Sequence, residues 1–285
     1  MRRVIASCPG SCGEIFQSLY QGQEILVSLG VNLYSWVLCQ ESPTGQCLWP
    51  RQQELVQLGT WGDLIPAHMQ RFSQLPVAKG CASSTADLLA VAQAQFLWRA
   101  DEASAGKLTS LCCQIEASDS VAFESWTVIQ PLTGRVFWQT DWKPDFWILM
   151  LEPKEEVVTG QMIRMSQDVS YSQEASERLL DEFQKACQNQ DLSALGQVAI
   201  HSALLNDQRL PKPFLSDLIS FVEEWGLLGL NVAHSGSVLG LWISKEETAR
   251  IPLLEAALDR LPLTSYYQKR SLLQPVYTGV RGEML

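Results

Sequence analysis

A long apolar helix that follows a loop of small residues is the feature that most constrains this chain. Residues 84–98 (STADLLAVAQAQFLW) contain no Gly or Pro and are apolar nearly all the way round, which predicts a helix buried inside the protein. The preceding loop holds Lys79, Gly80 and two serines. A helix N-terminus has unpaired N–H donors and a partial positive charge, so it binds phosphate where a glycine allows close approach. A serine hydroxyl there can also reach a Mg²⁺ ion shared with phosphate oxygens.

The same spacing also fits a plain helix cap, with Ser84 as the N-cap and Asp87 in the capping-box position. Spacing alone favours the cap, and the two interpretations are compatible because a phosphate can displace a cap. Familiar motifs do not occur elsewhere in the sequence: there is no GxxxxGK[ST], no GxGxxG after a strand and no GxSxG. A phosphate site in this chain therefore uses a different loop.

The pattern of strands and helices predicts an α+β protein of two layered domains, residues 1–143 and 144–285. Apolar, β-branched runs predict strands, and Ala-rich or amphipathic runs predict helices. The predicted strands are 4–6, 25–39, 126–130, 135–140, 146–151, 230–233 and 238–243. The predicted helices are 84–98, 102–116, 172–189, 192–206, 213–225 and 246–260. Residues 43–74 are expected to form a loop with a short helix.

The charge balance limits the partners that the chain can bind. Lys and Arg number 21 against 31 Asp and Glu, a formal charge of -10, so the long-range field repels nucleic acid and anionic lipid. A small phosphate site built from backbone N–H groups is still compatible with this charge. The N-terminus has no apolar run typical of a signal peptide, and no stretch approaches the ~20 apolar residues of a membrane helix. We therefore expect a soluble, cytoplasmic protein.

The eight cysteines are not spaced like a metal or disulfide framework. There is no CxxC and no Cys/His cluster, and the chain has only three histidines. We expect free thiols that act as small core residues, and no structural zinc site.

Three segments together resemble a known family. Residues 76–86 (PVAKGCASSTA) resemble the central phosphate-binding signature PxxxGLxSSA of the GHMP kinases, with Cys81 in place of the usual leucine. Residues 8–14 (CPGSCGE) resemble the N-terminal substrate-side motif, and residues 232–240 (VAHSGSVLG) resemble the C-terminal glycine-rich motif. Within this superfamily the motifs look most like those of bacterial L-threonine kinases, which make O-phospho-L-threonine for the aminopropanol arm of adenosylcobalamin.

The resemblance implies the two-domain GHMP kinase fold, an N-terminal ribosomal-protein-S5-domain-2-like domain and a C-terminal ferredoxin-like domain. It also implies ATP with Mg²⁺ and a small-molecule acceptor in the cleft between them. By resemblance the nucleotide-binding residues are Pro76, Lys79, Gly80, Cys81, Ala82, Ser83, Ser84 and Thr85. By the same resemblance the substrate-binding residues are Ser11, Cys12, Gly13, Glu14, His234, Ser235 and Gly236, with Glu14 holding the substrate's ammonium group.

Asp119 lies where several GHMP kinases carry the aspartate that accepts the proton of the substrate hydroxyl. The resemblance also implies that Lys79 offsets phosphate charge and that Ser84 and Glu116 are Mg²⁺ ligands, with Glu116 ending the predicted 102–116 helix. Spacing alone favours Asp119 as the cap of a turn, and the order of the three motifs is what raises the catalytic interpretation. Lys79 also fits a solvated loop lysine.

Three alternatives stay open at this point. A kinase of this fold could act on homoserine, mevalonate or another small alcohol. A protein with the same phosphate loop could bind ATP without catalysing transfer. A thiol-dependent enzyme using Cys8 or Cys12 is a third alternative, although no histidine lies near either in the sequence. The oligomeric state is left open.

Overall fold

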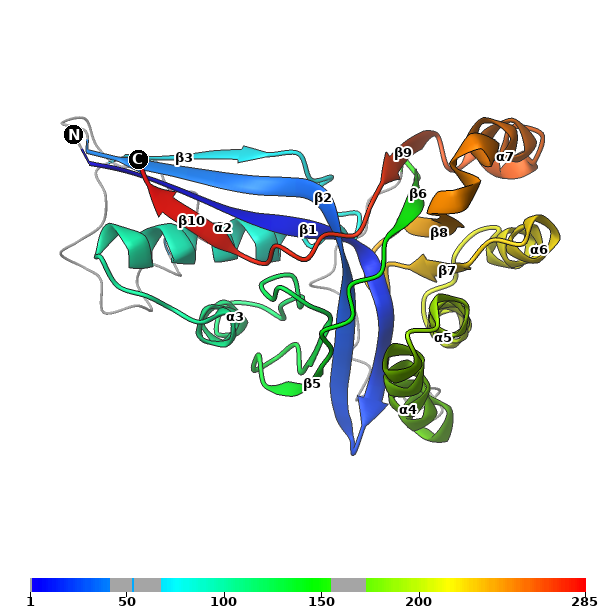
Figure 1. Cartoon of the computed structure of the whole chain (residues 1–285), viewed down its shortest axis with the longest axis horizontal. Coiled ribbons are helices and arrows are strands. Elements are labelled where there is room, and N and C mark those ends of the chain that lie inside the picture. The colour runs from blue at the N-terminus through cyan, green and yellow to red at the C-terminus, as the bar shows by residue number, and fades with distance from the viewer. Residues whose placement is uncertain (1, 42–52, 54–67, 155–172) are drawn as a thin grey trace.

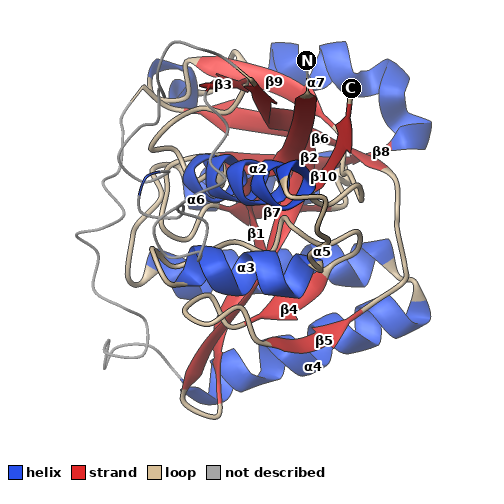
Figure 2. Ribbon diagram, turned by 90° about the vertical axis from the view of Figure 1, so that its left-hand side faces the viewer, coloured by secondary structure: helices blue, strands red, loops and turns tan. Residues whose placement is uncertain are grey.

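The computed structural model describes residues 2–41, 53, 68–154 and 173–285. Over these ranges, ten strands form one antiparallel sheet in the order β5-β4-β2-β1-β7-β8-β6-β9, with β3 beside β2 and β10 beside β1 (Figures 1 and 2). The strands are β1 Arg3–Tyr20, β2 Gln23–Gln40, β3 His68–Ser73, β4 Thr127–Ile129, β5 Val136–Gln139, β6 Phe146–Glu152, β7 Gly229–Val232, β8 Leu239–Ser244, β9 Lys269–Leu273 and β10 Arg281–Met284. The α-helices are α2 Ser83–Trp98, α3 Ala105–Cys113, α4 Gln173–Asn189, α5 Leu192–Asp207, α6 Leu215–Trp225 and α7 Ile251–Leu258.

A long hairpin of β1 and β2 links the part of the molecule beside α2 to the part beside α4 and α5 (Figure 1). Its turn residues, Gln21 and Gly22, both have positive φ, as the two-residue turns that match strand twist require. The hairpin bends near its middle, so that α2 lies along one half while α4 and α5 pack beside the other (Figure 1). Near the bend, β1 pairs with β7, so a segment from the start of the chain lies beside one from its last third.

The bend coincides with the first motif. The register of β1 against β2 shifts between Pro9 and Gly10 and again between Ser11 and Glu14. Gly13 has φ +64, and a Cβ there would lie 2.6 Å from the backbone nitrogen of Ala233. The sequence predicted only residues 4–6 as strand, because the glycines and proline of the motif weaken a strand pattern that the bulged register accommodates.

Helix α2 is buried on almost every side, as predicted. Leu88 and Leu89 are 1% and 0% exposed, and the helix packs between the hairpin and α3. A second core lies under α4 and α5, and a third between β6–β8 and the pair α6 and α7. The helix that carries the predicted phosphate loop is therefore fixed in position along its length.

Strands from the first and last thirds of the chain form one sheet. Glu14 of β1 pairs with Val232 of β7, and β10 returns to pair with the start of β1. Strand β6 begins at Phe146, shortly after the predicted boundary between residues 143 and 144. That division of the chain into two domains stays a prediction.

Most predicted elements and the α+β class are confirmed, with three corrections. Residues 68–73 were predicted as loop but form β3, an edge strand against β2; residues 43–67, apart from 53, lie outside the described ranges. The predicted helix 246–260 is a 3-10 helix, Lys245–Arg250, followed by α7, because Pro252 near the start of α7 lacks the N–H that a continuous helix would need. Helix α3 ends at Cys113, so Glu116 lies in the turn after it.

The cysteines behave as core residues. The seven described ones are free thiols, and all except Cys113 are buried. In the part of the chain that the structure covers, no helix is both long enough and apolar enough to cross a membrane.

Candidate active site

The three motifs meet at the bend of the hairpin. The backbone N–H groups of Ser11 and Gly13 donate to the carbonyls of Cys81 (3.0 Å) and Gly80 (3.2 Å). The carbonyl of Lys79 in turn accepts from the N–H groups of Ser237 (2.9 Å) and Val238 (3.1 Å). The phosphate-loop candidate is thus held on both sides by backbone hydrogen bonds to the other two motifs.

Two glycines make this contact possible. Gly80 has φ +84, and a Cβ on it would lie 2.3 Å from the Cβ of Ala233 and 2.9 Å from the Cα of Gly236. A Cβ on Gly236 would lie 2.3 Å from the carbonyl oxygen of Lys79. Since real Cβ atoms do not approach so closely, only glycine fits at either position.

The start of α2 differs from the predicted cap. The N-cap is Ala82, with φ 53, and among the described residues no side chain caps the helix there. Ser84 lies inside the first turn, so the prediction that it caps the helix is wrong. Asp87 does not complete a capping box either, because its carboxylate accepts from the hydroxyl of Ser35 (2.5 Å) and pairs with Arg71. The helix starts two residues earlier than the cap pattern requires, and Ser83 and Ser84 are only partly buried.

Asp119 lies beside the first turn of α2. Its Oδ2 accepts from the hydroxyl of Thr85 (3.1 Å) and its Oδ1 from the hydroxyl of Ser28 (3.1 Å), while its own N–H donates to the Thr85 oxygen (3.3 Å). Burial raises the pKa of Asp119 to about 7, with a further increase from the negative charge of Glu14 and a partial offset from the two hydroxyl hydrogen bonds. An acid in this position can hold or release a proton near neutral pH.

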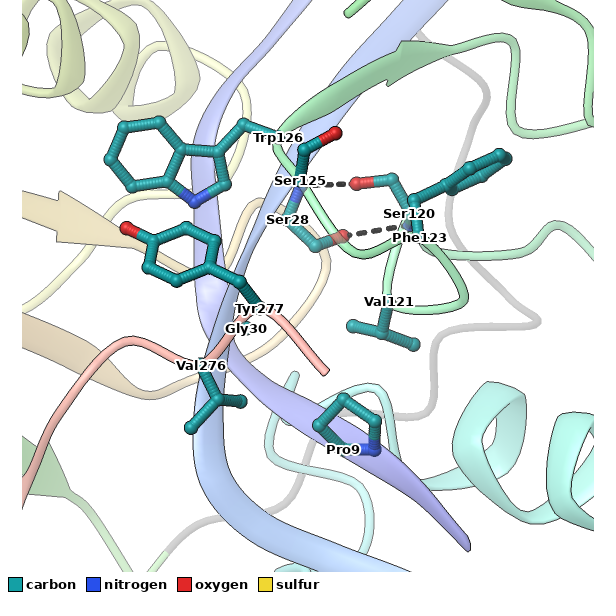
Figure 3. Close-up of a pocket in the computed structure, with 10 residues that line it drawn as sticks. All are labelled: Pro9, Ser28, Gly30, Ser120, Val121, Phe123, Ser125, Trp126, Val276 and Tyr277. Atoms are coloured by element: carbon teal, nitrogen blue, oxygen red, sulfur yellow. Dashed lines mark hydrogen bonds between the residues drawn. The ribbon is translucent and has the colours of Figure 1, made fainter. Parts of the chain in front are cut away.

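The loop around Asp119 is fastened to β2. Ser28 and Ser120 exchange two hydrogen bonds, Ser28 N–H to Ser120 Oγ (2.9 Å) and Ser120 N–H to Ser28 Oγ (3.1 Å). Figure 3 shows both serines at the edge of a small pocket whose opposite wall carries Trp126 and Tyr277, with ring centroids 5.7 Å apart. Because Ser28 bonds to both Asp119 and Ser120, the carboxylate has little freedom to move.

A second carboxylate, that of Glu14, is buried and joins the N-terminal and C-terminal motifs. Its Oε2 accepts from the N–H of His234 (2.8 Å) and from ring Nδ1 of His234 (3.2 Å). Ring Nε2 of His234 lies 2.8 Å from the hydroxyl of Ser202 on α5, which also accepts from the N–H of Gln17 (3.2 Å). His234 therefore lies between Glu14 and Ser202 and connects β1 with α5.

Lys79 is buried, and its ammonium donates to the carbonyls of Pro153 (2.8 Å) and Lys154 (2.7 Å). Cys12 is fully buried in the apolar core, and burial raises the pKa of its thiol well above the usual range, so it is not a reactive nucleophile. The same holds for Cys8, whose thiol pKa burial also raises.

The remaining predicted residues lie either where the three motifs meet or elsewhere in loops and turns. The loop and motif residues Ser11, Gly13, Cys81, Ala82, Ser83, Thr85 and Gly236 all lie where the three motifs meet. Pro76 lies earlier in the same loop, and Ser235 lies in the turn between β7 and β8, partly exposed. Glu116 is partly buried in the turn before Asp119. Across the described ranges, no three His, Cys, Asp or Glu side chains gather as a metal site would require.

Several residues of the site were not anticipated from the sequence. Ser28 and Ser202 hold the two carboxylate systems in place, and Lys212 donates from its ammonium to the carbonyl of Gly236 (2.7 Å). Ser28 and Ser202 are single polar residues among mostly apolar neighbours, so no local pattern distinguishes them. The one available signal was a lysine flanked by prolines (LPKPF), which indicates a fixed backbone there.

No protein-family model matches the chain. The chain is 34% identical to the L-threonine kinase of Salmonella typhimurium, over 98% of this chain and 95% of that protein. It is 32% identical to the L-threonine kinase of Citrobacter freundii, over 97% and 99%. Its fold matches that of mevalonate diphosphate decarboxylase from Staphylococcus aureus with a TM-score of 0.69, at 14% identity over 99% of this chain and 98% of that one. The chain therefore belongs to the L-threonine kinase family, within the GHMP kinase superfamily.

Proposed function

We propose that this protein is an ATP-dependent kinase that transfers the γ-phosphate of ATP to the hydroxyl of L-threonine, giving O-phospho-L-threonine and ADP. The observation that carries the proposal is the pairing of Asp119 with Thr85 in the uncapped first turn of α2. An acid whose pKa is about 7 lies beside a helix N-terminus suited to phosphate. The two curated relatives, both L-threonine kinases, support threonine as the acceptor.

In the proposed reaction, ionised Asp119 takes the proton of the threonine hydroxyl as its oxygen attacks the γ-phosphorus in line. The new oxygen–phosphorus bond forms while the bond between the γ-phosphorus and the β,γ-bridging oxygen breaks, and ADP leaves with that electron pair. The N–H groups at the start of α2 face the developing charge on the phosphoryl oxygens. Phosphoryl transfer depends mainly on such positioning and charge stabilisation.

We propose Ser84 and Glu116 as the protein ligands of Mg²⁺. The donors are chemically suited, because Mg²⁺ takes oxygen ligands, usually one or two from protein, and keeps the rest as phosphate oxygens and water. Ser84 is partly exposed at the phosphate-binding turn, and Glu116 precedes Asp119 by three residues. When bound, the ion would neutralise charge on the transferring group.

We assign Lys79 both a structural and an electrostatic role. Its ammonium is bound by two backbone carbonyls at the end of β6, and its own carbonyl accepts from the C-terminal motif. The positive charge at this buried position favours phosphate nearby. Glu14 supplies the negative charge that we assign to the ammonium group of the amino-acid substrate. The product would serve the aminopropanol arm of adenosylcobalamin synthesis, in the cytoplasm.

The test is ATP consumption with Mg²⁺ and L-threonine, L-serine, L-homoserine or mevalonate in parallel, with each product identified by mass. We expect phosphoryl transfer to L-threonine above the other acceptors. Transfer to another acceptor instead would retain the kinase and overturn its substrate. Binding of MgATP with no transfer to any acceptor would contradict the enzymatic function.

A further inference from the structure

Lys212 is a buried cation to which the proposed reaction assigns no role. It lies between α5 and α6 and is 6% exposed. Its ammonium donates to the carbonyl of Gly236 (2.7 Å), in the turn that packs on Gly80, and its N–H donates to Asp207 (2.6 Å). Burying an ammonium group is costly unless a negative group approaches it. Among the ion pairs of the described residues, none joins Lys212 to a carboxylate.

A buried amide lies in the last turn of α5, just before Lys212. Asn206 is 0% exposed, and its Oδ1 and Nδ2 both have no hydrogen-bond partner within the described structure. Ser202, one turn earlier on the same helix face, contacts Gln17 and His234, so this face of α5 lies against β1 and the C-terminal motif. An unsatisfied buried amide is unusual in a native protein and calls for a ligand.

Both positive and negative groups act on the pKa of Lys212. Burial lowers the pKa of Lys212 to about 8, and the nearby cation Arg209 lowers it further, while Glu14 and Asp207 oppose the change. Asp207 already accepts from the Lys212 N–H, and Glu14 already accepts two hydrogen bonds from His234. Glu14 is also the charge that acts on Asp119. Glu14 therefore lies within electrostatic reach of both Asp119 and Lys212.

We propose that Lys212 and Asn206 bind the α-carboxylate of the amino-acid acceptor and so make the enzyme select amino acids over other small alcohols. This inference rests on the proposed kinase function. An amino acid with a side-chain hydroxyl presents three groups: the hydroxyl to Asp119, the ammonium to Glu14 and the carboxylate to Lys212. The amide of Asn206 donates from Nδ2 to the same carboxylate. The ammonium of a lysine can pair with either a carboxylate or a phosphate. The test must therefore distinguish an effect on binding of the amino acid from an effect on binding of ATP.

The experiment compares the wild-type enzyme with Lys212→Met, using L-threonine and L-threoninamide, in which a neutral amide replaces the carboxylate. Removing one partner of a buried charged contact costs roughly 30-fold or more in binding, so we expect kcat/KM for L-threonine to fall by about that factor. The KM for ATP should stay unchanged. The wild type should prefer L-threonine to the amide strongly, and Lys212→Met should lose most of this preference. Calorimetric titration with L-threonine gives the same comparison without turnover.

Two variants separate binding from folding. Lys185→Met removes an exposed lysine of α4 and should change neither kinetic constant. Asn206→Leu replaces an unsatisfied amide by an apolar side chain of similar size, so it should leave thermal stability unchanged or raise it while it raises the KM for L-threonine. A purely structural Asn206 would not combine these two effects.

The outcomes also distinguish this inference from the proposed function. If the wild type phosphorylates L-threonine, and Lys212→Met loses equal efficiency with threonine and threoninamide, the carboxylate site is wrong and the kinase stands. A raised KM for ATP with an unchanged KM for L-threonine would assign Lys212 to phosphate instead and overturn the inference. If the wild type phosphorylates no amino acid, while binding MgATP, the proposed function itself fails.

Discussion

The two ends of the proposed acceptor site differ in how completely their polar groups are satisfied. At one end, both oxygens of Asp119 accept hydroxyl hydrogen bonds, from Thr85 and Ser28. At the other end, the amide of Asn206 has no partner within the described structure, and the ammonium of Lys212 has a single carbonyl. In the proposed mechanism, the reacting end would be held in place before substrate binds, whereas the binding end would be completed by the substrate. Rigid placement of the base is what phosphoryl transfer requires.

The largest expected effect comes from removing the negative charge of Asp119. Asp119→Asn keeps the size of the side chain but cannot accept the hydroxyl proton, so turnover should fall roughly 10³-fold. ATP affinity should be largely intact, because the phosphate loop does not change. Steady-state kinetics and equilibrium nucleotide binding measure the two quantities. Turnover equal to that of the wild type would remove Asp119 from the mechanism.

The contact between the loop and the C-terminal turn gives the next largest effect. Gly80→Ala would place a Cβ 2.3 Å from that of Ala233 at a φ of +84, so unfolding free energy should fall by about 3 kcal/mol and ATP affinity should fall with it. Gly22→Ala is the matched control, since its φ is +73 but a Cβ there meets nothing within 4 Å. The control should cost only about 1 kcal/mol, from backbone conformation alone. Equal losses for both variants in chemical denaturation would show that close packing at Gly80 is unimportant.

The pH dependence of kcat/KM tests the state of Asp119 directly. Because its pKa is about 7, the carboxylate takes up a proton below that pH and can no longer act as a base. The logarithm of kcat/KM should therefore fall about tenfold per pH unit on the acidic side of pH 7. A profile that stays flat down to about pH 5.5 would contradict a base with this pKa.

The smallest expected effect is the change that Asp119→Asn makes in the free energy of unfolding. The folded protein raises the pKa of Asp119 above the ~3.9 of an unfolded chain, so the folded state holds more protons and stability falls as pH rises from about 4 to 7. Asp119→Asn removes this penalty, and at about pH 8 it should be roughly 1 kcal/mol more stable than the wild type, a modest value because the side chain is partly exposed. The advantage should shrink as the pH falls and disappear below about pH 4, where Asp119 is protonated in both the folded and the unfolded state. A destabilised variant at pH 8 would mean that the hydrogen bonds to Thr85 and Ser28 matter more than the charge.

Local patterns predicted the framework of the molecule. The apolar run 84–98 and the hairpin 126–140 are confirmed because their periodicity and turn residues determine them within a short segment. The bulged strand through residues 8–14 was missed, because its glycines are required by contacts far away in the chain: a Cβ on Gly10 would meet the carbonyl of Cys81, and one on Gly13 would meet Ala233. Edge strand β3 was missed because its residues alternate poorly and only pairing with β2 makes them a strand.

The candidate site was predictable only where a motif carries it. The loop 76–86 and Asp119 could be identified from the sequence, and the structure brings them together through Thr85. The groups that hold them in place could not be identified: Ser28 meets Asp119 across 91 residues and His234 meets Glu14 across 220. Such contacts depend on the tertiary fold, and an isolated serine or asparagine carries no local sign of them.

The measurement that tests the account most directly is phosphorus NMR of the products formed from MgATP and L-threonine by the wild type and by Asp119→Asn. The account predicts O-phospho-L-threonine and ADP in equal amounts with the wild type, and almost none with the variant at matched enzyme concentration. ATP hydrolysed to ADP and free phosphate without phosphothreonine, or phosphothreonine formed equally fast by both proteins, would contradict it.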